Sequence, residues 1–352
     1  MDMSRQSLFK LIAILLGTLF SLLLVEVGYR VYHYCSYNDL KTIGAGQRKP
    51  VVQPNDELDL GRIIQLSAFR YIIYELIPSS RYLFQGVLVE TNAQGFRDKN
   101  YPAVKSKKTF QIIGLGDSVM FGWGVNEGDC FLTKLENKLN EQDSITYEIV
   151  NTAVPGYNTV MEVATLAHKI DLEKVDMVII NYIGNDCHLP NFIRKKPDYF
   201  SLRQSLVFQR LEDNDGIDGN LQSAPFNKQG TDYAHTLDRV PPEYHDMVDI
   251  DAYMNAMKRL KQLQDEYGFK VITLATNPDA EAMDYVQIAC KENGFELMDV
   301  FPVWQSHKAA YPDDKWGLSK KDGHPSAPSH AMIAGVLERG ILEWLRTVEI
   351  GL

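Results

Sequence analysis

The chain has 352 residues, of which 45% are hydrophobic and 23% charged, an ordinary composition for one large folded domain or two. Its formal net charge of −10 argues against a nucleic-acid partner, because phosphate binding needs clustered lysine and arginine side chains. The four cysteines form no CxxC pair, which excludes the common zinc signatures and leaves the disulfide state open: Cys35, Cys130, Cys187 and Cys290.

The N-terminal segment has the composition of a membrane helix. Residues 11–25 carry no charge, and the apolar run of residues 11–29 contains Glu26 as its only charged residue. A helix of about 19 residues spans roughly 28 Å, which is close to the hydrocarbon thickness of a bilayer. We therefore expect residues 11–29 to contact the membrane.

The charges in front of this run indicate its orientation. Arg5 and Lys10 precede it, so the positive-inside rule predicts a cytoplasmic N-terminus and an extracytoplasmic remainder. Residues 1–30 are thus expected to be a cytoplasmic tip and a single-pass signal-anchor helix. A cleaved signal peptide is the alternative, although no small-x-small cleavage site follows Val25 and no lipobox precedes Cys35.

The stretch after the predicted membrane helix divides into two parts. Residues 31–66 are polar and contain prolines and glycines, which predicts a linker. Residues 67–90 are rich in aromatic side chains and are expected to form short strands against a folded domain over residues 67–350. Further on, Arg97 would either contact an anionic substrate or form a structural ion pair.

Strand and helix patterns alternate from residue 109 onward. Short apolar, β-branched runs predict five strands, at residues 109–115, 147–151, 175–182, 270–276 and 296–300. Apolar side chains at a spacing of three to four predict helices near residues 129–141, 158–169, 251–267, 279–293 and 327–346. This alternation predicts a parallel five-stranded sheet covered on both faces, a flavodoxin-like three-layer α/β/α sandwich.

Residues 187–250 interrupt the alternation without a clear period. A plain loop of this length is uncommon in a compact domain, so we expect an insertion over the carboxyl edge of the sheet, where it would set substrate preference. The acidic run Asp213–Asp218 is a weak calcium candidate, because Ile217 stands where an EF-hand loop needs a ligand.

Polar residues follow the predicted strands at the edge where ligands bind in open α/β sheets. Ser118 comes after the first strand, Gly156 after the second and Asn185 after the third, and Asp322 and His324 lie just before the last helix. A serine hydroxyl needs a neighbouring base to become a good nucleophile. His324 is the best candidate for that base, because its segment alone combines an adjacent acid with a following helix.

These segments resemble the four sequence blocks of the SGNH/GDSL hydrolase family over roughly residues 90–346. The resemblance implies the SGNH hydrolase fold, with residues 67–350 as the catalytic domain. It implies that Ser118 is the nucleophile and His324 the base, and that the N–H groups of Ser118 and Gly156 and the side chain of Asn185 form the oxyanion hole.

The acid departs from the pattern of the family. The family usually places the acid three residues before the histidine, and this chain has Lys321 at that position. Asp322, which lies two residues before His324, is therefore the candidate. Asp322 would hold the His324 ring so that Nε2 faces the serine. Asp313 and Asp314 are the fallback candidates.

Nucleotide and metal sites fit the sequence less well. A dinucleotide fingerprint would need a third glycine where Val119 stands, and an α/β-hydrolase elbow would need glycine in place of Met120. Asp186 and His188 could bind a metal, but no third ligand is evident. We therefore expect neither a cofactor nor a metal.

The expected function is that of a membrane-anchored serine esterase acting outside the membrane on a small-molecule or glycan ester, with O-acetylated carbohydrate as the suggested substrate. An acyl-enzyme would form on Ser118 and be released to water. Two alternatives stay open: an O-acyltransferase of envelope or exported polysaccharide, and a non-catalytic, anchored carbohydrate-binding protein on the same scaffold. The sequence leaves the acyl group and the oligomeric state undetermined.

Overall fold

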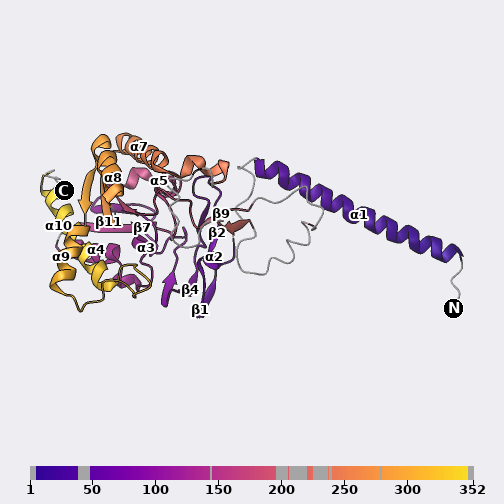
Figure 1. The fold of residues 1–352 in the computed structure, drawn as a ribbon, viewed down its shortest axis with the longest axis horizontal. Coiled ribbons are helices and arrows are strands. Elements are labelled where there is room, and N and C mark those ends of the chain that lie inside the picture. The colour runs from indigo at the N-terminus through magenta and orange to yellow at the C-terminus, as the bar shows by residue number, and fades with distance from the viewer. Residues whose placement is uncertain are drawn as a thin grey trace.

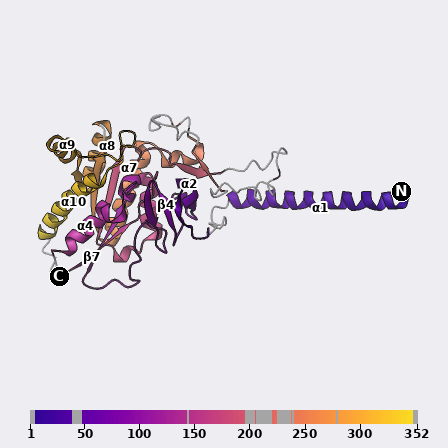
Figure 2. The ribbon, with the colours of Figure 1, turned by 90° about the horizontal axis from the view of Figure 1, so that it is seen from below.

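The structure is a computed structural model that describes residues 5–38, 48–142, 145–195, 205, 220–224, 237, 240–277 and 280–347. A long N-terminal helix, α1 (Arg5–Asn38), projects away from a domain built around a central sheet (Figure 1). Figure 2 shows the same projection after a quarter turn about the horizontal axis. The amino and carboxyl ends of the chain thus lie at opposite ends of the molecule.

The central sheet has five parallel strands in the order β12-β11-β8-β6-β7. Its strands are β6 (Thr109–Leu115), β7 (Thr146–Asn151), β8 (Met177–Ile183), β11 (Lys270–Asn277) and β12 (Glu296–Asp299). Numbered along the chain within the sheet, this order is the flavodoxin-like order 2-1-3-4-5. The predicted fold class is therefore confirmed.

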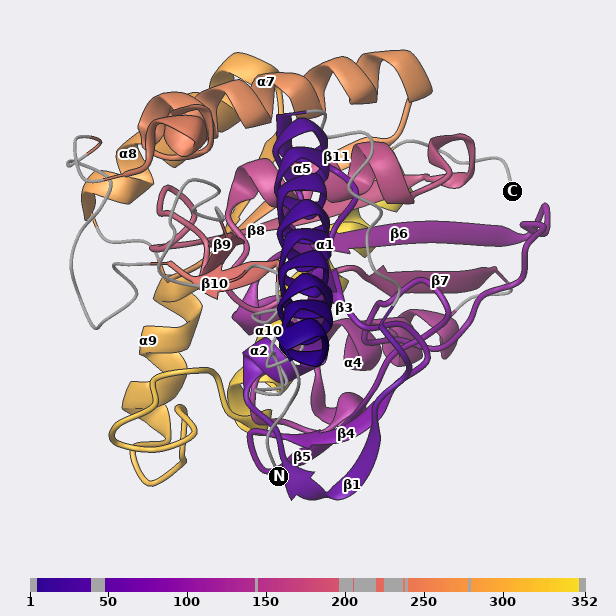
Figure 3. The same cartoon turned by 90° about the vertical axis from the view of Figure 1, so that its right-hand side faces the viewer.

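Helices cover both faces of the sheet (Figure 3). Helices α5, α7 and α8 lie over one face, and α4 and α10 pack together over the other. The helices of this domain are α3 (Ser118–Phe121), α4 (Phe131–Asn140), α5 (Thr159–Lys169), α7 (Ile250–Tyr267), α8 (Ala280–Asn293), α9 (Phe301–Ala310) and α10 (Ala327–Thr347). Three 3₁₀ turns join them, η1 (Glu127–Asp129), η2 (Leu172–Lys174) and η4 (Pro242–Met247).

Alternate side chains of the strands enter two separate cores. In β8, Met177 and Ile179 belong to the core on the α4 and α10 face, whereas Val178 and Ile180 belong to the core under α5 and α7. Both sets are buried, so these four consecutive positions need apolar residues. That requirement is why the strand appears as a continuous apolar run in the sequence.

A second layer of short strands precedes the sheet. Its elements are β1 (Val52–Glu57), α2 (Leu60–Ile63), β2 (Ile64–Leu66), β3 (Tyr74–Leu76), β4 (Arg81–Phe84) and β5 (Val87–Glu90). The strand β1 pairs in parallel with β4, which pairs antiparallel with β5, and β2 pairs antiparallel with β3. The short strands expected at residues 67–90 are present in this layer.

The predicted linker over residues 31–66 is wrong for its second half. Residues 52–66 form β1, α2 and β2, and Ile63 and Ile64 are fully buried in the core. The six residues of β1 are all exposed, because it is an edge strand held by backbone hydrogen bonds, and its polar composition therefore resembles that of a linker. The helix α1 also extends beyond residue 30, to Asn38.

The described parts of the insertion at residues 187–250 include the antiparallel pair β9 (Phe192–Arg194) and β10 (Leu221–Ser223). Arg194 Nη2 donates to the carbonyl oxygens of Ser67 (3.0 Å) and Phe69 (3.2 Å), which joins the insertion to the layer of short strands. The acidic run at residues 213–218 lies outside the described residues.

Three of the described helices were not predicted, the four-residue helices α2 and α3 and the longer α9. The helix α9 follows β12 directly, with Pro302 in its first turn, and it buries none of its residues. A helix without a buried stripe shows no apolar periodicity in the sequence, which explains why it was missed.

Candidate active site

Ser118 lies at the first position of α3, immediately beyond the carboxyl end of β6. Asp117 caps this short helix, since its Oδ1 accepts a hydrogen bond from the Val119 N–H at 3.0 Å. The Ser118 side chain is 7% exposed. The turn therefore holds the hydroxyl at the edge of the sheet, within a largely buried site.

His324 connects this serine to an acid. Its Nε2 lies 2.9 Å from Ser118 Oγ, and its Nδ1 lies 2.6 Å from Asp322 Oδ1. With Asp322 ionised, Nδ1 carries the proton and donates it, which leaves Nε2 free to accept from the serine hydroxyl. Among the described residues it is Asp322, rather than Asp313 or Asp314, that bonds to His324.

The loop itself fixes the unusual spacing of the acid and the histidine. The backbone N–H of His324 donates to Asp322 Oδ1 at 3.1 Å, and the N–H of Asp322 donates to Ser319 Oγ at 3.0 Å. Burial by itself raises the pKa of Asp322, but hydrogen bonds from the backbone and ring of His324 and from Trp123 outweigh it and lower the pKa. The carboxylate form that orients the imidazole is thereby favoured.

Trp123 is a member of the site that the sequence reasoning missed. Its Nε1 donates to Asp322 Oδ2 at 3.2 Å, and its ring stacks on the His324 imidazole with centroids 4.8 Å apart and an interplanar angle of 14°. Trp123 and Asp322 are 199 positions apart. No local motif indicates such a contact.

Arg97 supports the segment that carries Trp123. Its guanidinium is buried and donates to the carbonyl oxygens of Phe121 (3.0 Å), Gly122 (2.6 Å) and Val125 (2.7 Å). Among the described residues Arg97 forms no ion pair, so that expectation is wrong, and its guanidinium instead holds the turn after α3.

Gly156 lies next to the serine turn. The neighbouring Val154 N–H donates to the Gly116 carbonyl oxygen at 3.2 Å, which joins the segment after β7 to the segment before Ser118. Gly156 has a φ of +79°, and a Cβ at this position would lie 2.3 Å from Asn191 Nδ2. Both the backbone conformation and the lack of space therefore require glycine here.

Asn185 approaches the site from the turn after β8. Its Nδ2 donates to Asp117 Oδ2 at 3.2 Å, and the same carboxylate oxygen lies 3.2 Å from Ser118 Oγ. Only one of the two amide N–H bonds of Asn185 is used in this contact. Asp117 thus links the asparagine to the serine.

A group of buried carboxyls lies behind these residues. Burial raises the pKa of Asp117, and it raises the pKa of Glu162 and of Asp186 well above the ordinary values, with mutual repulsion adding to the effect. Asp186 accepts hydrogen bonds from Thr159 Oγ1 (2.9 Å) and the Ile183 N–H (2.5 Å). Within the described part of the chain, both oxygens of Glu162 are buried without a hydrogen-bond partner.

A metal site was also considered. Over the described residues, no group of three or more His, Cys, Asp or Glu side chains is arranged to hold a metal ion.

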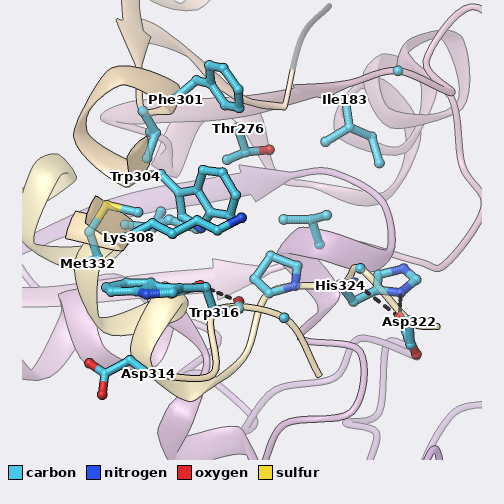
Figure 4. Close-up of a pocket in the computed structure, with 18 of the residues that line it drawn as sticks. Ile183, Thr276, Phe301, Trp304, Lys308, Asp314, Trp316, Asp322, His324 and Met332 are labelled. Atoms are coloured by element: carbon cyan, nitrogen blue, oxygen red, sulfur yellow. Dashed lines mark hydrogen bonds and ion pairs between the residues drawn. The ribbon is translucent and has the colours of Figure 1, made fainter. Parts of the chain in front are cut away.

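A cavity of about 820 Å³ opens beside His324 (Figure 4). Its walls come from α9, from the loop that carries Asp322 and His324, and from the start of α10. The residues brought together by the fold thus border a space large enough for a substrate.

Comparisons with known proteins identify the family. The model of the GDSL-like lipase/acylhydrolase family matches residues 112–337, which is more than half of the chain and includes every predicted site residue. No curated protein sequence matches the chain.

Several solved structures resemble the fold at low identity. A lipase/acylhydrolase from Enterococcus faecalis is 15% identical, with a TM-score of 0.39, over 66% of this chain and 95% of that one. The acetylxylan esterase Axe2 from Geobacillus stearothermophilus is 16% identical, with a TM-score of 0.40, over 65% and 93% of the two chains.

A third such structure is the esterase EstA from Pseudoalteromonas sp., which is 12% identical, with a TM-score of 0.41, over 67% of this chain and 98% of that one. At these values the identification depends on the family model and not on the individual structures. The family suggested by the sequence blocks is confirmed: the chain belongs to the GDSL-like lipase/acylhydrolase family, and it is an ester hydrolase of the SGNH type.

Proposed function

We propose that the protein is a serine esterase in which Ser118 attacks the ester carbonyl carbon and forms an acyl-enzyme that water then releases. The observation that carries this proposal is the distance of 2.9 Å between Ser118 Oγ and His324 Nε2. A second contact supports it, since the Asp322 carboxylate lies 2.6 Å from the other ring nitrogen. A nucleophile, a base and an orienting acid are thereby aligned.

The proton moves through His324. Its Nε2 accepts the Ser118 proton as the new C–O bond forms, and then donates it to the oxygen of the departing alcohol. In the second half of the reaction, the same nitrogen takes a proton from water as the water attacks the acyl carbon. It then returns this proton to Ser118 Oγ as the bond between the acyl carbon and the serine oxygen breaks. Asp322 keeps the imidazole in the tautomer that this cycle needs, a contribution on the order of 10⁴ in kcat in serine proteases.

The negative oxygen of the tetrahedral intermediate needs hydrogen-bond donors. We assign this role to the backbone N–H groups of Ser118 and Gly156 and to the side-chain amide of Asn185. The N–H of Asn185 that Asp117 does not use is available for this purpose. Loss of one such donor typically costs about 3–4 kcal/mol of transition-state stabilisation.

The proposal includes a location outside the membrane. The helix α1 contains an apolar stretch, Phe9–Tyr32, with a mean hydropathy of 2.4 and no buried residue in its most apolar 18-residue window. Within it, Arg30 Nε lies 2.7 Å from Glu26 Oε1, so the two charges offset each other. We assign α1 as the anchor and the rest of the described chain as an extracytoplasmic catalytic domain that acts on O-acetylated carbohydrate.

The proposal is tested by hydrolysis of p-nitrophenyl acetate by the full-length protein in detergent. Ser118→Ala and His324→Ala should each reduce kcat by at least about 10³-fold, because each removes a participant in covalent catalysis. Ser106→Ala and His168→Ala are matched controls at exposed positions and should retain activity. Full turnover in either Ser118→Ala or His324→Ala would refute the assignment.

The acyltransferase alternative uses the same site, with a sugar hydroxyl in place of water. Measuring free acetate against acetylated sugar after incubation with an acyl donor separates the two. The non-catalytic alternative would be favoured if Asp322 could not reach His324, and their separation of 2.6 Å argues against it.

A further inference from the structure

The cavity beside His324 lies on one particular side of the proposed catalytic serine. Among the described residues, its lining includes Asp322, His324 and Gly184, the neighbour of Asn185, but neither Gly156 nor Asn185 itself. The proposed acid–base pair therefore borders the cavity directly, whereas the proposed oxyanion donors of the described chain are not part of its lining.

That position indicates which part of an ester would enter. In the acyl-enzyme mechanism, the histidine donates its proton to the oxygen of the departing alcohol, so the alcohol has to lie within reach of His324 Nε2. The carbonyl oxygen points toward the oxyanion donors instead. The cavity is consequently on the side of the alcohol part of the substrate.

Helix α9 contributes an aromatic and a charged side chain to the wall of the cavity. Trp304 and Lys308 are four positions apart on this helix and share one face, which lines the cavity. Lys308 Nζ lies 4.7 Å from the centroid of the Trp304 ring. In Figure 4, the side chain of Lys308 extends along Trp304 with its nitrogen toward His324.

A second indole lines the cavity after the end of α9. Trp316 donates its Nε1–H to the Tyr311 carbonyl oxygen at 3.1 Å, and its own carbonyl oxygen accepts from Ser329 Oγ at 2.5 Å. These bonds hold the ring in place. The cavity therefore presents two aromatic side chains, one of which is rigidly fixed.

The charge of Lys308 is not neutralised by the protein. Within the described part of the chain, no carboxylate lies within ion-pair distance of Lys308, although the carboxylates of Asp314 and Asp322 also line the cavity. A lysine that projects into a cavity without a carboxylate partner is suited to a negatively charged ligand. An aliphatic acyl chain in the same place would desolvate the ammonium group without compensation.

We propose that this cavity binds the alcohol part of the substrate as a negatively charged pyranoside. A pyranose ring packs its C–H face on Trp304 and Trp316, and its anionic substituent pairs with Lys308. The inference rests on the proposed esterase function, because the direction of the leaving alcohol follows from the role of His324. It adds the substrate class: an acylated, acidic glycan.

The test compares the hydrolysis of three esters by the full-length protein in detergent. Ethyl acetate has an alcohol too small to fill the cavity, an acetylated xylo-oligosaccharide is neutral, and an acetylated oligogalacturonate is anionic. Release of acetate gives kcat/KM for each ester. Lys320→Ala, which removes a neighbouring exposed lysine outside the cavity lining, is the control and should change none of the three.

The three esters are compared in two variants, Trp304→Ala and Lys308→Ala. Trp304→Ala should lower kcat/KM for both glycan esters about tenfold more than for ethyl acetate. Lys308→Ala should lower it about tenfold more for the oligogalacturonate ester than for the neutral one, and high salt should reduce this difference. Equal effects of both variants on all three esters would overturn the inference and leave the esterase assignment standing.

A binding measurement separates the inference from the catalytic proposal. Binding of deacetylated oligogalacturonate, the product alcohol, is followed by the tryptophan fluorescence of the Ser118→Ala variant. The same titration is made with the double variants that add Trp304→Ala or Lys308→Ala. Each second substitution should weaken binding about tenfold. If no ester is hydrolysed but this binding pattern holds, the esterase proposal fails and the glycan site stands.

An acyl-chain site would give a different pattern. If Trp304→Ala reduced turnover of ethyl octanoate far more than that of ethyl acetate and left the glycan esters unaffected, the cavity would bind the acyl chain. That outcome would overturn the inference.

Discussion

Trp123 shows how single side chains prepare the site. The Asp322 side chain is about one third exposed (34%), so its carboxylate could rotate into water. The Trp123 indole holds one carboxylate oxygen, while His324 holds the other. The same indole limits rotation of the imidazole by stacking on it. Trp123 is therefore a positioning residue that acts through the acid and the base.

This role predicts the effect of Trp123→Phe, which keeps an aromatic ring but removes the indole N–H. We expect kcat for p-nitrophenyl acetate to fall about tenfold, the typical value of one hydrogen bond to a charged group, with little change in KM. Steady-state kinetics, together with the thermal midpoint as a check of folding, provides the measurement. An unchanged kcat in a folded variant would argue against the role.

Glu162 predicts a pH dependence of stability. Its buried carboxyl faces Asp186 and Asp117 and has a pKa raised well above the ordinary glutamate value of about 4.3. The folded state therefore keeps a proton that the unfolded state releases above that value. Stability from this group is fully present at low pH and is lost as the pH rises toward the folded-state pKa.

Glu162→Gln replaces the carboxyl by a neutral group of the same shape. Relative to the parent, the variant should gain stability as the pH rises from 5 to 8, by about 1.4 kcal/mol for each unit of folded-state shift within that range. Urea unfolding at the two pH values gives the comparison. A stability difference that is the same at both pH values would show that Glu162 does not hold an excess proton.

At the scale of elements, Asn158 joins helix α5 to the insertion. Its Oδ1 accepts from the Met161 N–H at 3.1 Å and so caps α5, while its Nδ2 donates to the carbonyl oxygens of His188 (2.9 Å) and Met247 (2.8 Å). All three contacts lie near the segment of Gly156. The start of α5 thus ties the described ends of the insertion to the proposed oxyanion hole.

Two substitutions separate these contacts. Asn158→Ala removes all of them and should lower the free energy of unfolding by about 2–4 kcal/mol, since a cap is lost and two buried carbonyls lose a donor. Asn158→Asp keeps the acceptor for Met161 but turns a buried carboxylate oxygen toward the two carbonyl oxygens, so it should cost at least as much. Urea unfolding measures both. A loss below about 0.5 kcal/mol in Asn158→Ala would contradict this account of the junction.

The elements also show what the sequence can and cannot predict. The five strands and five helices of the sandwich were predicted with ends within about two residues, because burial on both faces gives each an apolar pattern. The strand β1 and the helix α9 were missed, because β1 is exposed throughout and α9 has no fully buried residue. The elements α2 and β2 were missed although they contain buried residues, because three or four residues are too few to show a period. Elements that face solvent or line a cavity show no such pattern.

The candidate site follows the same logic. Ser118, Gly156 and Asn185 stand directly after strands, where a local motif and a family resemblance point to them. The contact between Ser118 and His324 joins residues 206 positions apart, and only the fold brings them together. Trp123 and Arg97 act through long-range contacts, so the sequence did not indicate Trp123 at all and indicated Arg97 without its partners.

At the scale of the whole molecule, α1 is the element whose apolar surface is not covered by the described part of the protein. Its apolar side chains are exposed along the helix, for example Leu19 at 68% and Ile14 at 66%. An exposed apolar helix of 24 residues is long enough to span a bilayer. The proposed orientation places Arg5 in the cytoplasm and the domain outside.

This orientation is tested by cysteine labelling. Val104 is 82% exposed on the domain, whereas Cys130, Cys187 and Cys290 are buried. In a Cys35→Ser background, Val104→Cys should react with a membrane-impermeant maleimide in intact spheroplasts, and Arg5→Cys should react only after lysis. Labelling of Arg5→Cys alone in intact spheroplasts would reverse the topology, and recovery of the parent protein in the soluble fraction would indicate a cleaved signal.

The most direct test of the central claim is mass spectrometry of the protein after reaction with a fluorophosphonate. The account predicts one covalent adduct, on the peptide that contains Ser118, with labelling abolished in Ser118→Ala and strongly slowed in His324→Ala. An adduct on a different serine, or undiminished labelling of Ser118→Ala, would contradict the assignment of Ser118 as the nucleophile.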